Sequence, residues 1–184
     1  MRRFVEFIDA LSDFSGRAVA WLTLLMVLVT FLVVVLRYWF DLGWIWLQEG
    51  VTWMHAAVFL LGGAYTLRHE EHVRVDVFYR KRDARGRAWV DVFGALCFLL
   101  PMCLFLLWSS LDYVGASWQL NEASREAGGL PYPLVPLMKS LMPLAMLFLT
   151  VQGVADLVRN VAILRGRPLP PRDLVTSASH PEIL

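Results

Sequence analysis

The chain has 184 residues, of which 58% are hydrophobic, and its mean hydropathy is +0.54. This composition excludes an ordinary soluble domain. The formal net charge of +1 gives no indication of a nucleic-acid partner. The two cysteines, Cys97 and Cys103, would lie about 9 Å apart along one helix, which is too far for a disulfide between them.

The apolar residues fall into four runs, each long enough to cross a hydrocarbon layer of ~30 Å, which needs about 20 helical residues. A backbone in lipid must satisfy its own hydrogen bonds, so each run is expected to be a helix. We predict an all-α membrane protein with one membrane domain, residues 17–164. The expected transmembrane helices cover about residues 18–36, 44–66, 89–114 and 134–158.

Residues 1–16 have apolar side chains at helical spacing, with acidic residues between them. This pattern predicts a short amphipathic helix at the cytoplasmic surface of the membrane. The apolar run that follows is too long for a signal peptide and has no small-residue cleavage site, so it is expected to remain as an anchor. Residues 165–184 lose the apolar period and are predicted to be a disordered cytoplasmic tail. The apolar positions of the first segment are Phe4, Phe7, Ile8, Leu11 and Phe14, and the acidic ones are Glu6, Asp9 and Asp13.

Basic residues are distributed very unevenly over the connections. Fourteen lie in the leader, the second connection and the tail, whereas the first and third connections contain only Arg37 and Arg125. Because basic residues stay on the cytoplasmic side, both termini are predicted to be cytoplasmic.

The second run divides into two faces when it is drawn as a helix. One face is polar or small and is expected to pack against protein. The opposite face is apolar and is expected to contact lipid. The polar face contains Gln48, Glu49, Thr52, His55, Ala56, Gly62, Gly63 and Thr66, and the apolar face contains Leu47, Val51, Met54, Val58, Leu61 and Tyr65.

Charged residues inside the spans are expected to pair, because an isolated charge at such depth costs several kcal/mol. Glu49 and Lys139 both lie about five residues below the outer end of their helices, and Arg37 lies near the same level. We predict a structural bridge between Glu49 and either Lys139 or Arg37. The alternative is that one of these groups titrates during transport.

The histidines and the helix-breaking residues have simpler interpretations. His55, His69 and His72 come from one helix and its end, so they are expected to form hydrogen bonds or shape the loop rather than bind haem or zinc. Pro101 predicts a kink in the third helix. The glycines and prolines of residues 118–133 predict an outer connection that is rich in turns. No catalytic or phosphate-binding motif is found, so no enzyme or cofactor is predicted.

With these residues identified, the chain resembles the small membrane subunit (DctQ-type) of tripartite ATP-independent periplasmic (TRAP) transporters. The resemblance covers about residues 4–164, including the four helices and their orientation. The matching pattern is Arg37-Tyr38, then Trp46 and Glu49, then Leu61-Gly62 and Ala64, and finally His72-Val73-Arg74-Val75-Asp76.

The resemblance implies a scaffold subunit in the bacterial inner membrane that supports a large permease (DctM-type) in sodium-driven uptake. A periplasmic binding protein would deliver the solute, usually a carboxylate. Two other classes stay open: a haem-binding anchor subunit of an oxidoreductase, and a small carrier that works alone. The turn-rich composition of the outer connection suggests that it touches the binding protein. The expected interface residues are Arg37, Trp46, Glu49, Thr52, His55, Ala56, Gly62, Gly63, His72, Asp76 and Lys139, and the expected binding-protein contacts are Trp118, Asn121, Glu122, Arg125 and Glu126.

Overall fold

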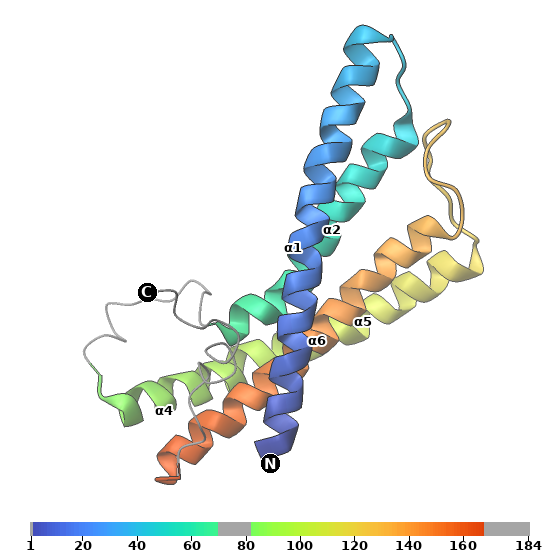
Figure 1. The fold of residues 1–184 in the computed structure, drawn as a ribbon. Coiled ribbons are helices and arrows are strands. Elements are labelled where there is room, and N and C mark those ends of the chain that lie inside the picture. The colour runs from blue at the N-terminus through green and yellow to red at the C-terminus, as the bar shows by residue number, and fades with distance from the viewer. Residues whose placement is uncertain (1, 70–81, 168–184) are drawn as a thin grey trace, which may run out of the picture.

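The computed structural model describes residues 2–69 and 82–167 (Figure 1). Within these ranges the chain is helical, without strands, and four helices are long and apolar enough to cross a membrane. The predicted all-α fold with four spans is therefore confirmed. The elements are α1 (Arg2–Trp39), α2 (Ile45–Arg68), α4 (Ala84–Gly94), the π-helical turn η1 (Ala95–Leu99), α5 (Leu100–Gln119) and α6 (Leu134–Leu164). The third span is α4, η1 and α5 joined end to end.

Helix α6 is the centre of the bundle, because it contacts α1, α2, α4, η1 and α5. Two helical hairpins, α1–α2 and α5–α6, cross and then diverge (Figure 1). They diverge toward the connections at residues 40–44 and 120–133, which we call the loop end. At the opposite end α1 begins, α2 ends, α4 begins and α6 ends, and we call it the basic end.

The N-terminal segment does not form a separate short helix, which corrects the expected division at residue 16. Helix α1 runs without a break from Arg2 into the first apolar run. The face of this segment that packs on the bundle contains buried Val5 and Ile8, which cluster with Ala155 of α6. Phe7 and Phe14 are exposed, at 68% and 69%. The acidic side of the segment, rather than its aromatic side, therefore meets the protein.

The face of α2 that was expected to contact lipid packs inside the chain instead. All six residues of this face are half-buried rather than exposed. Ala57 and Ala64, seven residues apart beside this face, are buried, and small residues at such spacing let a second helix approach closely. Gly16 of α1 lies against Tyr65 of α2, where an added Cβ would be 2.2 Å from the ring. The prediction that this face contacts lipid was therefore wrong, since periodicity identifies two faces but not the neighbour of each.

Pro101 changes the third span in the turn that precedes it. Proline has no N–H and its ring collides with the carbonyl one turn earlier. The backbone widens into the π-helical turn η1, where the N–H of Leu100 bonds to the carbonyl of Ala95. Leu99 of this turn packs against Gly153 of α6, where an added Cβ would lie 2.8 Å from the leucine.

Helix α6 ends at Leu164, where the expected tail begins. Most of that tail, residues 168–184, lies outside the described residues. His72 and Asp76 also lie outside them, so their expected interface role stays a prediction.

Candidate functional site

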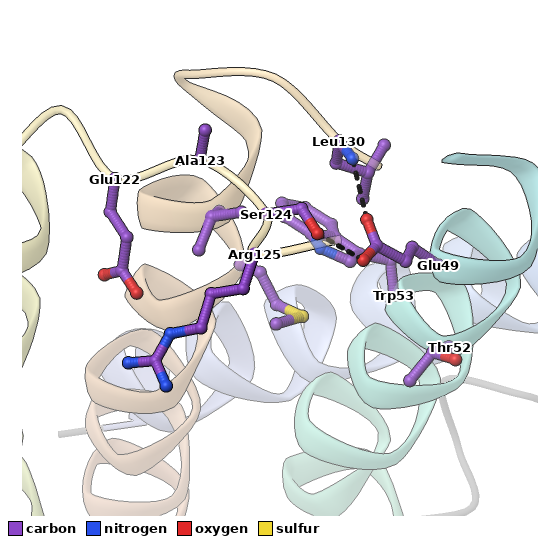
Figure 2. Close-up of a pocket in the computed structure, with 10 residues that line it drawn as sticks. Glu49, Thr52, Trp53, Glu122, Ala123, Ser124, Arg125 and Leu130 are labelled. Carbon is purple, nitrogen blue, oxygen red and sulfur yellow. Dashed lines mark hydrogen bonds between the residues drawn. The ribbon is translucent and has the colours of Figure 1, made fainter. Parts of the chain in front are cut away.

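Glu49, in the second turn of α2, attaches the 120–133 connection to this helix (Figure 2). The Ser124 hydroxyl donates to its Oε1 at 2.5 Å, and the Leu130 backbone N–H donates to its Oε2 at 2.7 Å. Gly129 passes so close that an added Cβ would lie 2.8 Å from Oε2 of Glu49. Only glycine fits there, and the carboxylate is satisfied by charge-assisted hydrogen bonds.

Lys139 of α6 attaches the start of the same connection. Its Nζ lies 2.5 Å from Oε2 of Glu122, and the Ser117 hydroxyl of α5 donates to that oxygen at 2.6 Å. The ammonium also lies 4.2 Å from the centre of the Tyr113 ring, which adds a cation–π contact. The connection is thereby tied to α5 and α6 as well as to α2.

The expected bridge from Glu49 to Lys139 or Arg37 was therefore wrong. Glu49 bonds to the connection, Lys139 pairs with Glu122, and Arg37 is exposed. The expectation paired charges between helices only, whereas the connection folds back and supplies the partners. The spacing of Glu122 and Ser124 carries no helical period that would have indicated this.

A second polar cluster joins α1 to α6 at the basic end. The guanidinium of Arg159 forms a two-point salt bridge with the carboxylate of Asp9, in which Nη1 lies 3.2 Å from Oδ1. Beside it, Gln152 is completely buried and accepts a hydrogen bond of 2.8 Å from the Ser12 hydroxyl. Arg159 also pairs with Asp156 one turn before it.

The same cluster extends to α2 through Arg68. This side chain is 2% exposed and forms a salt bridge with Asp13. Its Nη1 donates to the backbone carbonyl of Asp9 at 2.6 Å. Buried charges need partners of opposite charge, so the basic end is fixed by ionic contacts among α1, α2 and α6.

Sequence reasoning missed this cluster, although a signal was present. Asp9, Ser12 and Asp13 share one side of the N-terminal helix, and Arg68 is the last residue of the second span. The acidic side was interpreted as the solvated side of an interfacial helix. The further clue in the sequence was Gln152, a polar residue within the apolar fourth span. Its presence indicated that a polar side of another helix packs against this span.

The predicted interface residues of α2 divide between two faces. Glu49 bonds to the connection, Ala56 is half-buried, and Gly63 lies where an added Cβ would be 3.7 Å from Leu149 of α6. Thr52 and His55 are exposed, and an added Cβ at Gly62 would meet nothing within 4 Å. Trp46 is 47% exposed, and its backbone N–H donates to the Gly128 carbonyl at 3.2 Å, which satisfies one free donor of the helix start.

The residues expected to contact the binding protein fall into two groups, those held by contacts within the chain and those that are exposed. Trp118 donates its indole N–H to Ser140 at 3.1 Å, and Glu122 is held by Lys139, so both take part in contacts within the chain. Asn121, Arg125 and Glu126 are exposed. Arg125 also lines a cavity of about 320 Å³ between α2, α6 and the connection (Figure 2).

Among residues 2–69 and 82–167, no group of three or more His, Cys, Asp or Glu side chains is arranged to hold a metal ion. Cys97 is exposed and Cys103 is buried, and both are free thiols.

Four apolar spans, with charged residues that join three of them at the basic end and hold the connection at the loop end, define a multi-pass helical membrane subunit. The family model of the DctQ component of tripartite ATP-independent periplasmic transporters matches residues 26–162, well over half of the chain. The chain therefore belongs to this family and is a transporter component of the inner membrane, not an enzyme.

The C4-dicarboxylate TRAP transporter small permease protein DctQ of Vibrio cholerae serotype O1 (strain ATCC 39315 / El Tor Inaba N16961) is similar to the chain. The two are 30% identical over 111 residues, which cover 60% of this chain and 46% of the relative. The matched part thus spans less than half the length of that protein. No solved structure matches the chain.

Replacing Arg159 by leucine is expected to destabilise the bundle by about 3–5 kcal/mol, because Asp9 is left as a buried charge without its main partner. Thermal unfolding in detergent micelles measures the change. The double variant Arg159→Leu with Asp9→Leu should recover part of the loss. Arg165→Leu, an exposed arginine at the same end, is the control and should have little effect. An unchanged midpoint for Arg159→Leu would contradict the assigned role.

The hydrogen bond from Lys139 holds the pKa of Glu122 below its ordinary value of 4.5, and the Ser117 hydroxyl adds to this effect. Because the folded-state pKa is lowered, the contribution to stability is present above the unfolded pKa and is lost as pH falls through the folded value. Glu122→Gln should therefore lower the unfolding midpoint at about pH 7, and this difference should shrink progressively as the pH falls below about 4. The exposed Glu126→Gln is the control. A difference that persisted at low pH would argue against the ion pair.

Proposed function

We propose that the chain is the small scaffold subunit of a TRAP secondary transporter. In this role it supports a large permease during sodium-driven uptake of a carboxylate that a periplasmic binding protein delivers. Membership of the DctQ family supports this role, and the name of the Vibrio cholerae relative, a C4-dicarboxylate transporter component, supports a carboxylate as solute.

The observation that carries the scaffold role is the use of the internal charges. Asp9, Arg68 and Arg159 join helices at the basic end, and Glu49 and Lys139 fix the connection at the loop end. Carrier sites in membranes are usually built from interrupted helices whose ends coordinate substrate and ions. Here the four spans run through, and the charged groups serve to hold them together, which suits a rigid support.

The proposal includes an orientation with both termini in the cytoplasm. It rests on the excess of basic residues at the basic end, since such residues remain on the cytoplasmic side. In this orientation the 120–133 connection faces the periplasm. In the variant Arg125→Cys, a thiol reagent that cannot cross membranes should label the new cysteine in intact cells. Labelling only after the cells are broken would contradict the proposed orientation.

Reconstitution tests the role directly. Proteoliposomes that contain this chain alone should take up no radiolabelled C4-dicarboxylate. Uptake should appear only with the large permease, the binding protein and an inward sodium gradient, and removal of any one should abolish it. Uptake by this chain alone would overturn the scaffold role in favour of a small carrier. A haem spectrum from the purified chain that disappears in His55→Leu would favour an oxidoreductase anchor.

The exposed tip of the connection is proposed to contact the binding protein. Arg125 and Glu126 are exposed on a connection that Glu49 holds at Ser124 and Leu130, so a partner meets charges on a firmly held loop. Arg125→Gln should raise the binding-protein concentration needed for half-maximal uptake and leave the maximal rate unchanged. Arg37→Gln, an exposed arginine at the same end, is the control. If Arg125→Gln and the unaltered chain needed the same binding-protein concentration for half-maximal uptake, the proposed contact would be contradicted.

A further inference from the structure

One side of α2 presents an unpartnered row of residues, which we call the exposed stripe. It consists of Gln48, Thr52, His55, Phe59 and Gly62, spaced four, three, four and three residues apart, so these positions share one face of the helix. Gln48, Thr52 and His55 are exposed, Phe59 is 78% exposed, and an added Cβ at Gly62 would meet nothing within 4 Å.

Contact between the exposed stripe and lipid tails is unfavourable, because the stripe contains polar side chains. The hydroxyl of Thr52 bonds to the Gln48 carbonyl of its own helix at 3.3 Å and is satisfied. No other side chain or backbone group in the described parts of the chain bonds to the amide of Gln48 or the imidazole of His55. Unsatisfied polar groups are strongly disfavoured in hydrocarbon, and ionisable residues within spans usually face protein.

The other exposed faces of the bundle differ in this respect. On α1 the outward residues include Trp21, Leu24 and Phe31, and on α5 they include Phe105 and Trp108. These side chains are apolar over the middle of the spans and suit lipid tails. The contrast indicates that α2, rather than α1 or α5, meets a protein neighbour.

The shape of the stripe fits a helix. Phe59 projects outward, and Gly62 lies one turn further along the same face, so a bulky side chain stands beside an open position. Small residues at such positions let two membrane helices approach closely. Toward the loop end the stripe continues into the cavity of about 320 Å³, because Thr52 lines both (Figure 2).

We propose that one transmembrane helix of the large permease packs along the exposed stripe and presents a hydrogen-bonding side chain at the depth of His55. This inference rests on the proposed function. The permease is favoured over a second copy of the chain because the family is one component of a multi-part transporter. A two-fold contact between copies would also set the bulky Phe59 rings against each other.

Photocrosslinking in native membranes tests which neighbour is present. A photoreactive phenylalanine replaces Phe59 in one variant and Phe105 in a second, since both rings are exposed, at 78% and 67%. Illumination should join the Phe59 variant to a protein with the mass of the permease and leave the Phe105 variant without that product. A product of twice the mass of this chain, attachment to lipid alone, or stronger crosslinking from Phe105 would each overturn the proposal.

Two glycines give a matched test of the contact itself. An added Cβ meets nothing within 4 Å at Gly62 or at Gly115 of α5, so the chain itself tolerates a side chain at both. Gly62→Leu should lower the amount of permease that co-purifies by about tenfold, as expected from overpacking a close contact, whereas Gly115→Leu should not. Gel filtration of each variant alone should give an unchanged elution volume. Equal recovery of permease with both variants would overturn the proposal.

Substitution of His55 separates hydrogen bonding from shape. His55→Leu should reduce recovery of the permease, and His55→Gln, which retains a donor and an acceptor, should restore most of it. Equal recovery with both would remove the hydrogen-bonding partner from the proposal. If the unaltered chain itself recovers no permease, the proposed function fails. If it does and the variants behave like it, only the assignment of the stripe fails.

Discussion

Arg159 and Arg68 come from different helices and meet on the first turns of α1, where Asp9 and Asp13 neutralise them. A membrane protein gains little from hydrophobic contact between helices, because lipid tails are as apolar as its side chains. The positions of the helices relative to one another are therefore set by polar contacts, which lipid cannot replace. The ionic cluster joins three of the four spans at the basic end.

The loop end uses the same chemistry with a different architecture. The two helical hairpins diverge at this end, and the 120–133 connection lies between their ends (Figure 1). Glu49 and Lys139 each hold one part of it. The result is a support that is closed by helix contacts at one end and by a fixed connection at the other. On the outward side of α2, the side chains of Gln48 and His55 lack hydrogen-bond partners within the described residues.

Much of this arrangement could be predicted from the sequence, and the failures have a common cause. Run length gave the four spans, and the polar residues of the second span indicated a surface for protein contact. The partners of Glu49 and Lys139 were missed because helical periodicity contains no information about an irregular connection. The apolar face of α2 was wrongly assigned to lipid, since polarity separates two faces without showing what covers each. The acidic side of residues 2–16 was taken for a solvated surface because its partners, Arg68 and Arg159, lie far away in the sequence.

The length of α1 has a consequence for where the ionic cluster lies. With 38 residues the helix is about 57 Å long, nearly twice the ~30 Å thickness of a hydrocarbon layer. If the apolar half of α1 occupies the layer, its first three or four turns stand among the lipid headgroups and the adjoining water. The buried arginines are then located at a dielectric boundary rather than in oil. Such a position lowers the desolvation cost of five charged side chains while the surrounding helices still exclude most water from them.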